Sequence, residues 1–195
     1  MNQDSPFDRF EAIAAAREVD EFALNTEAIR IGSDLEGLRE LVRRYSGSSN
    51  VLLVRAVGFP LASAPWDFDD PDVGLNDLTL EFISATGTTD DGGTLSMCMT
   101  ALQGLNAKDL FATRTDADRS SVAWLLLRCL DHADINVRAG VLQLMAHLSD
   151  SGRLQPSVAP QMVARLKSRI AELAETEGDE LSVELADLRD FLTPP

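Results

Sequence analysis

The sequence predicts an all-α fold. Residues that favour helices, mainly Leu, Ala, Glu and Arg, are abundant, aromatic residues make up only 6% of the chain, and long runs of alternating β-branched residues are absent. The 195 residues include 45% hydrophobic residues, which is enough for a continuous core. We therefore expect one compact domain made of helices.

The segment from Ser120 to Ser149 is the most informative part of the chain. It contains two amphipathic stretches joined by a short turn at Asp134. Two helices of this length cannot bury their apolar faces alone, so such a pair stacks on similar pairs. This hairpin is typical of the repeating unit of an α-solenoid.

Apolar residues recur along the chain at steps of roughly 41 to 46 residues, which is the period of such arrays. In the first helix of each expected pair, the recurring residues are Leu38, Leu80, Val122 and Val163, then Leu41, Ile83, Leu125 and Leu166. In the second helix, they are Val51, Leu95, Val137 and Leu181, then Ala56, Leu102, Leu144 and Leu188. The spacing predicts a right-handed α-solenoid of about four antiparallel helix pairs.

One hairpin also carries a motif. In chain order its residues are Leu125, Leu126, Leu130, Asp134, Val137, Arg138, Ala139, Leu142 and Leu148. This order resembles the HEAT repeat of HEAT and armadillo proteins, which has a leucine-rich first helix, an Asp in the turn and Val-Arg at the start of the second helix. The resemblance covers residues 33–192 by period and about 30 residues by motif. It implies that Arg138 holds a neighbouring turn, with Asp134 as the nearest acid, and it implies no activity.

The N-terminal segment precedes the periodic region. Ser5 followed by a proline predicts an N-capped helix over residues 5–19, and residues 20–30 form a connector or a second helix. Ser33 and Glu36 have the spacing of a capping box that starts the first pair. We expect residues 1–32 to be an N-terminal capping helix or helices and residues 33–195 to be the HEAT-like repeat domain.

The C-terminal segment predicts two more helices. Ser157 begins the first, Gly178 ends it, and Asp179 caps a last helix that stops before Pro194. Asp134 is expected to cap the second helix of its own hairpin.

The charge balance limits the choice of partner. The chain has 32 acidic and 17 basic residues, for a formal net charge of −15. Proteins that contact phosphates need clusters of Lys and Arg, so direct nucleic-acid binding is not expected. A strongly acidic surface favours encounter with a basic protein, although the same charge also serves solubility.

The connection from Ala64 to Asp77 is the main candidate for partner binding. Two prolines and a glycine make a continuous helix improbable there, and aromatic residues among carboxylates are typical of an interaction loop. The candidate residues in this loop are Trp66, Asp67, Phe68, Asp69, Asp70 and Asp72. Alternatively, the two aromatic residues pin the loop into the groove between helix pairs.

Further acids are expected in the turns and loops, where those of successive pairs would form a negative ridge. They are Asp90, Asp91, Asp116 and Asp118. Turns and helix caps require the same residue types, and for each of these acids taken singly this structural interpretation is favoured.

Groups that carry catalysis are scarce. His132 and His147 are the only histidines, and we expect His132 to end its helix as a cation near the dipole. Cys98 and Cys129 are expected to be buried, reduced thiols. No phosphate-binding loop, nucleophile elbow or metal motif occurs, so we expect no enzyme activity, no metal and no cofactor.

Three functions fit these observations. The leading one is a non-catalytic binding protein, an acidic inhibitor or immunity-type protein that neutralises a basic partner such as a toxin or nuclease. The alternative is a scaffold or assembly adaptor that grips a helix or peptide. The third is a lyase similar to the HEAT-like chromophore lyases. The longest apolar run is too short to cross a bilayer and the N-terminus lacks a secretory pattern, so we expect a cytoplasmic protein without membrane contact.

Overall fold

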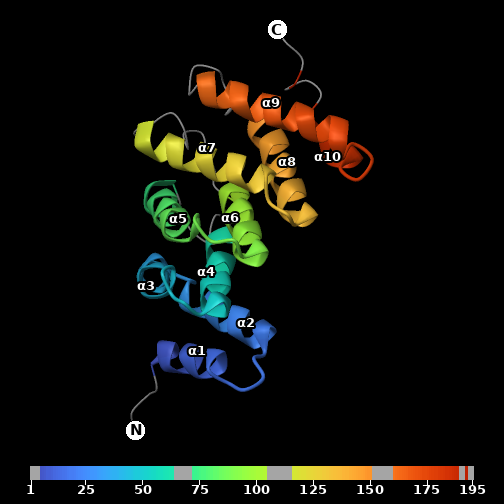
Figure 1. Ribbon diagram of the computed structural model, residues 1–195. Helices are drawn as coiled ribbons and strands as arrows, with labels where there is room; N and C mark the ends of the chain where they lie inside the picture. Colours follow the sequence, from blue (N-terminus) through green and yellow to red (C-terminus); the bar gives the residue numbers. More distant parts are fainter. Residues whose placement is uncertain (1–4, 64–71, 105–115, 151–159, 189–191, 193–195) are drawn as a thin grey trace. The chain divides into compact units, whose positions relative to one another are not determined.

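The computed structural model describes residues 5–63, 72–104, 116–150, 160–188 and 192 (Figure 1). Every regular element in these residues is a helix and none is a strand, so the predicted all-α class is confirmed. The elements are α1 (Pro6–Ala14), α2 (Glu21–Ile31), α3 (Leu35–Tyr45), α4 (Val51–Ser63), α5 (Asp72–Thr86), α6 (Gly92–Gly104), α7 (Asp116–Leu130), α8 (Ile135–Asp150), α9 (Pro160–Thr176) and α10 (Ser182–Ala186).

The chain divides into two compact units, residues 1–106 and residues 107–195. The first contains α1 to α6 and the second contains α7 to α10. The expected boundary after residue 32 lies inside the first unit, because α2 packs on α3 and α4. Whether the whole chain is one domain stays a prediction. No helix in the described part of the chain is long and apolar enough to span a bilayer.

In the first unit, the helices form two rows of neighbours (Figure 1). Along one row, α2 packs on α4 and α4 packs on α6; along the other, α3 packs on α5. Each helix of one row also packs on its partner in the other, as α1 on α2, α3 on α4 and α5 on α6. The first unit is therefore a stack of three helical hairpins.

The recurring apolar positions lie in the core of both units. Leu41, Ile83, Leu125 and Leu166 are at most 3% exposed, and Ala56, Leu102, Leu144 and Leu188 are fully buried. Burial of one such side chain stabilises a fold by roughly 1.5 to 3 kcal/mol, so the spacing seen in the sequence marks the packed faces. Among the recurring positions whose side chains are described, Val51, at 40% exposed, and Leu80, which is partly exposed, are the exceptions.

Small residues set the close approach of neighbouring helices in the first unit. A Cβ atom added to Gly32 would lie 2.6 Å from Cβ of Pro60 in α4. A Cβ atom added to Gly58 of α4 would lie 2.6 Å from Cβ of Met97 in α6. Both distances are far below van der Waals contact, so α2, α4 and α6 pack this closely only because these positions lack a side chain.

The N-terminal helix α1 is fixed to α3 through Tyr45. The rings of Phe7 and Phe10 lie 6.4 and 5.2 Å from its ring, and its hydroxyl donates a 2.6 Å hydrogen bond to Glu11. Burial, and then the bond to Glu11, raise the pKa of Tyr45 to about 12. The first helix is thus held by apolar and polar contacts together.

The expected N-terminal caps are partly confirmed. Ser5 caps α1 within a capping box, although α1 ends at Ala14 and not near residue 19. Residues 21–31 form a helix. The capping box expected at Ser33 is wrong: Asp34 accepts the hydrogen bond from the Gly37 amide at 2.7 Å, while the Ser33 hydroxyl donates to the Arg30 carbonyl. A carboxylate in that position is an equally good cap, and the sequence places the two side by side.

In the second unit, α7 packs on α8 and on α9, and α8 packs on α10. Asp134 caps α8 as expected, because its carboxylate accepts the backbone N–H of Asn136 at 2.9 Å. At the C-terminal end, α9 ends at Thr176 and Gly178 follows its C-cap, as expected, while Ser157 lies outside the described residues. The cap expected at Asp179 is wrong, because Leu181, which has no capping side chain, precedes α10. A five-residue helix forms here because Leu181 and Leu188 bury its ends.

Candidate functional site

Acceptor side chains occupy equivalent places at the start of the second helix in four hairpins. Asp20, Asn50, Asp91 and Asp134 each accept a backbone N–H within the first turn of α2, α4, α6 and α8. For Asp91, which was expected to belong to the negative ridge, this geometry favours the cap interpretation. In the first unit the row of acids is also interrupted, because residues 46–50 contain no charged side chain.

Asp91 is engaged inside the first unit. Nε of Arg55, on α4, donates to its Oδ2 at 2.9 Å, and the backbone N–H and hydroxyl of Thr94 donate to the same oxygen at 2.7 Å each. Arg55 first, and then Thr94, hold the pKa of the Asp91 carboxyl well below its usual range. This expected partner-binding acid therefore joins two neighbouring hairpins.

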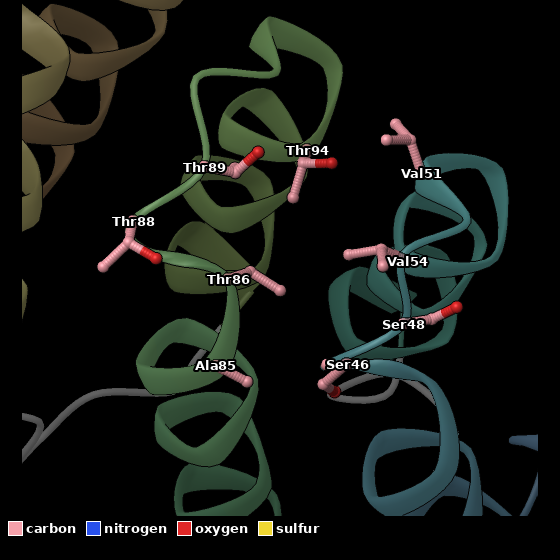
Figure 2. Close-up of a pocket in the computed structure, with 10 residues that line it drawn as sticks. Ser46, Ser48, Val51, Val54, Ala85, Thr86, Thr88, Thr89 and Thr94 are labelled. Atoms are coloured by element: carbon pink, nitrogen blue, oxygen red, sulfur yellow. The ribbon is translucent and has the colours of Figure 1, made fainter.

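A hollow of about 150 Å³ lies beside this ion pair, between the α3–α4 and α5–α6 turns (Figure 2). Its lining consists of Ser46, Gly47, Ser48, Val51, Val54, Ala85, Thr86, Thr88, Thr89 and Thr94. Six of these residues carry a hydroxyl, and none of the described lining residues is charged. The hollow is open to solvent on one side. It is a small polar depression at the turn edge of the first unit.

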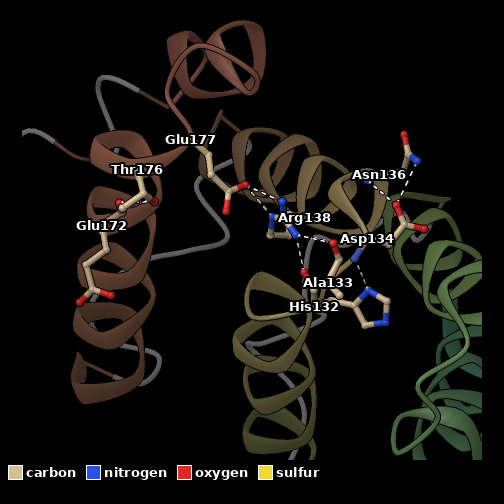
Figure 3. A network of polar contacts seen from close by, with 8 residues as sticks. All are labelled: His132, Ala133, Asp134, Asn136, Arg138, Glu172, Thr176 and Glu177. Carbon is tan, nitrogen blue, oxygen red and sulfur yellow. Dashed lines mark hydrogen bonds and ion pairs between the residues drawn. The ribbon is translucent and has the colours of Figure 1, made fainter.

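The second unit holds a comparable polar network around Arg138 (Figure 3). Its guanidinium donates to Oε2 of Glu177 from Nε at 2.9 Å and from the terminal nitrogen Nη2 at 2.6 Å. Its other terminal nitrogen donates to the carbonyl oxygens of His132 and Ala133. The guanidinium therefore pairs with an acid of the next hairpin, in place of the expected Asp134. Asp134 is already bonded to Asn136.

His132 itself differs from expectation. Its Nδ1 accepts the backbone N–H of Asp134 at 3.0 Å. This hydrogen bond holds the His132 ring against the turn that leads into α8. The helix ends two residues earlier, at Leu130.

Other arginines are also paired internally. The ion pairs are Arg9 and Arg30 with Glu27, Arg43 and Arg44 with Glu40, and Arg169 with Asp131 and Glu172. In each the arginine bonds to an acid of its own unit, so much of the positive charge is compensated locally. The excess of negative charge therefore resides in acids elsewhere on the surface.

The segment 172–187 is the densest group of acids in the described part of the chain. It holds Glu172, Glu175, Glu177, Asp179, Glu180, Glu184 and Asp187, and no Lys or Arg. Five of these seven acids are exposed. Val183, an apolar residue of the same segment, is 71% exposed. This surface was not predicted, because partner-binding acids were expected in loops, whereas most of these acids lie on α9, α10 and the turn between them.

A second exposed feature lies on α2. Phe22 is 82% exposed and Ile29, seven residues later on the same face, is 42% exposed. Residues 20–30 were expected to form a connector or a second helix, and an exposed apolar face was not predicted there. The seven-residue spacing between these two apolar residues was the signal that could have indicated this face.

The predicted loop residues have different outcomes. Trp66, Asp67, Phe68, Asp69 and Asp70 lie outside the described residues. The backbone of Asp72 starts α5, and those of Asp116 and Asp118 lie in the first turn of α7, not in loops. Acids favour the positive end of the helix dipole, which explains why helices begin there. Asp90 is exposed in the α5–α6 turn.

Cys98 and Cys129 are buried thiols, as expected, and burial raises the pKa of Cys129 to about 11. A raised pKa keeps the sulfur protonated and unreactive at neutral pH. No group of three His, Cys, Asp or Glu side chains suited to a metal ion occurs within the described ranges.

Comparisons with family models, with curated proteins and with solved structures returned no match to this chain.

Proposed function

We propose that this chain is a non-catalytic, HEAT-like α-solenoid that binds and neutralises a basic protein, as an acidic inhibitor or immunity-type protein does. The observation that carries the proposal is the distribution of charge. Many arginines are paired with acids of their own unit, while a net charge of −15 remains. Such a surface attracts a basic protein and raises the rate of encounter.

The packing supports a repeat architecture. The hairpins of the first unit stack in two rows, and α7 to α10 of the second unit make the same kinds of contact, with α7 on α9 and α8 on α10. Most of the residues at the predicted period are buried in both units. Stacked hairpins of this kind present extended surfaces suited to protein binding.

The acids of residues 172–187 are the surface that we propose for the partner. Glu175, Asp179 and Glu180 are exposed, and their change to Lys removes negative charge without breaking a recorded ion pair. The matched control changes Glu18, Glu36 and Glu81 to Lys, because these are equally exposed and give the same change in net charge.

The experiment starts from the full chain as bait in its host, with washes at low and then high salt and identification by mass spectrometry. The captured basic protein is then purified and its association rate with each triple variant is measured against ionic strength. We expect the first variant to associate on the order of tenfold more slowly, with a weaker salt dependence than the control. A partner that is not basic, or binding that is insensitive to salt, would contradict the proposal. Several subunits of one assembly would favour an adaptor.

A further inference from the structure

We propose that the face shared by α2 and α4 binds an amphipathic helix of the basic partner, with the apolar side of that helix on the face and its cations beside the acids at one end. The inference rests on the proposed function and adds a second contact, made by the first unit. It is argued from the exposed apolar side chains of the two helices, their alignment and the charges around them.

Apolar side chains occupy equivalent exposed positions on α2 and α4. Counted from the capping residue, which is Asp20 for α2 and Asn50 for α4, they are the second and the ninth residues. They are Phe22 and Ile29 on α2, and Leu52 and Phe59 on α4. The two on α2 are 82% and 42% exposed, and the two on α4 are partly exposed. Because residues seven apart lie on one face of a helix, each pair forms a short apolar stripe.

The same positions in α6 and α8 carry small or polar residues. They are Gly93 and Thr100 after the cap at Asp91, and Asn136 and Gln143 after the cap at Asp134. Such residues suit a face that meets water, so the hairpin architecture itself does not require apolar side chains there. Large apolar side chains gathered on an exposed face mark an interaction site.

The two stripes lie side by side because α2 packs on α4 (Figure 1). At the N-terminal ends, the bond to Asp91, and to a lesser degree the nearby charge of Glu21, raise the pKa of Arg55. At the C-terminal ends, a Cβ atom added to Gly32 would lie 2.6 Å from Cβ of Pro60. The helices are therefore parallel and in register, and the four apolar side chains form one strip.

A helix suits this strip better than an extended segment does. The described residues contain no strand to which an extended backbone could hydrogen-bond. A helix satisfies its own backbone hydrogen bonds and needs only side-chain contacts. Seven residues advance a helix by about 10.5 Å, so apolar residues at i and i+7 of a bound helix match the spacing of each stripe.

The charge around the strip favours a basic helix. In the described residues of α2, α4 and α6 the bases are Arg30 and Arg55, and each is bonded to an acid of its own unit. Asp20 and Glu21 are exposed at the N-terminal end of α2. The described part of the first unit contains 14 acidic and 7 basic residues. Lysines or arginines are thus complementary to this face, whereas a second copy of the chain would bring like charge against it.

Exposed residues allow the strip to be altered without disturbing the fold. Phe22→Gln with Ile29→Gln removes the apolar stripe of α2, and Glu21→Gln removes one charge at its end. The matched control is Ser84→Gln with Ala85→Gln, because both residues are exposed on α5, in the other row. Glutamine is a good helix former, so all variants should keep the helical circular dichroism and the urea midpoint of the parent chain.

The probe is a fluorescein-labelled amphipathic peptide of leucine, lysine and alanine, with leucines at i, i+3 and i+7. A second peptide has the same composition with its leucines scattered around the helix, and a third has glutamate in place of lysine. The second keeps the general attraction to the acids of this chain, so its difference from the first isolates the apolar strip. Binding to the full chain is measured by fluorescence anisotropy, and amide shifts of the ¹⁵N-labelled chain locate it.

We expect the first peptide to bind most tightly and to shift the amides of its four contact residues, Phe22, Ile29, Leu52 and Phe59. The double change on α2 should weaken binding on the order of tenfold, and the control on α5 should leave it unchanged. Glu21→Gln should weaken it about threefold at low salt, and the glutamate peptide should not bind.

Equal affinity for the amphipathic and scattered peptides, or unchanged affinity after the double change on α2, would overturn the inference. So would a dimer of the full chain in sedimentation that the same double change abolishes, since a second copy would then occupy the face.

The captured basic partner separates this inference from the proposed function. If the partner binds with the same affinity to the chain that carries Phe22→Gln and Ile29→Gln, the helix-binding face is wrong and the proposed function stands. If the amphipathic peptide binds the strip and no basic partner is found, the face is supported and the proposed function fails.

Discussion

Replacement of Arg138 by Met is the change that tests the hairpin contacts of the second unit most directly. The Arg138 side chain is only 12% exposed, and its guanidinium bonds to Glu177 of the next hairpin and to two turn carbonyls of its own hairpin. Methionine keeps much of the apolar stem and removes every donor. The loss is therefore a loss of polar contacts, with little change in packing volume.

The expected cost follows from these contacts. Removing one member of a buried ion pair costs about 3 to 5 kcal/mol, but the Glu177 side chain is 27% exposed and water can partly solvate it. The carbonyl groups of His132 and Ala133 also lose their charged donor. This raises the cost by about 1 kcal/mol for each carbonyl, before any compensation by water. We therefore expect the free energy of unfolding to fall by about 3 kcal/mol. Glu177→Gln keeps an acceptor for the guanidinium and should cost about 1 kcal/mol.

Urea unfolding followed by tryptophan fluorescence measures this change. The chain has two tryptophans, so a Trp66→Phe background leaves Trp124, which lies on α7 and reports on the second unit. Arg165→Met is the control, since Arg165 is exposed on α9 and its loss should change stability by less than about 0.5 kcal/mol. A double-mutant cycle then isolates the coupling of Arg138 with Glu177. A loss below about 1 kcal/mol for Arg138→Met would refute the reasoning.

Three further results are expected. The single tyrosine, Tyr45, should titrate near pH 12 by ultraviolet absorbance; because this pKa lies above the ordinary value of 10.0, its contribution to stability is complete below pH 10 and lost as pH rises towards 12, and an ordinary pKa would contradict its burial. The pKa of Asp91 is lowered on folding, so its contribution is present above about pH 4 and lost as pH falls further; Asp91→Asn should flatten the acid dependence of unfolding, and an unchanged curve would count against the ion pair. Gly58→Ala should destabilise the first unit by about 1 to 3 kcal/mol through its clash with Met97, whereas Gly47→Ala should be neutral or stabilising in the same melt, and equal effects would contradict the packing.

The sequence predicted the helical class and most of the core well, because burial depends on apolar spacing that one chain displays directly. Leu41, Ile83, Leu125 and Leu166 follow the predicted period and are all buried. The caps at Ser5 and Asp134 were also predicted correctly, because a cap bonds to amides only two or three residues away in the sequence.

Contacts over longer distances were predicted poorly. Arg138 was matched with an acid four residues away, whereas its partner, Glu177, is 39 residues along the chain. Arg55 bonds to Asp91, 36 residues away, and no feature of the sequence near Arg55 points to that acid. Sequence spacing within one hairpin does not reveal which side chain of the next hairpin comes within reach. That depends on the packing of α4 on α6 or of α8 against its neighbours.

Arg55 and Arg138 also change how the acids of the turns are interpreted. Both arginines lie four or five residues after the cap of a second helix, at Asn50 or Asp134, and both bond to an acid of the following hairpin. An acid held by such an arginine contributes to the coupling of neighbouring hairpins and adds little to the outer field.

A count of Asp and Glu in turns therefore overestimates the charge available to a partner, and the exposed acids without such an arginine are the better guide. On α9, α10 and the turn between them, Glu175, Asp179 and Glu180 meet this criterion, while Glu177 does not. Two variants test this distinction: charge reversal of these three acids together, and charge reversal of Glu177 alone. If both slowed association equally and the Glu177 variant lost no stability, the distinction between structural and partner-binding acids would be wrong.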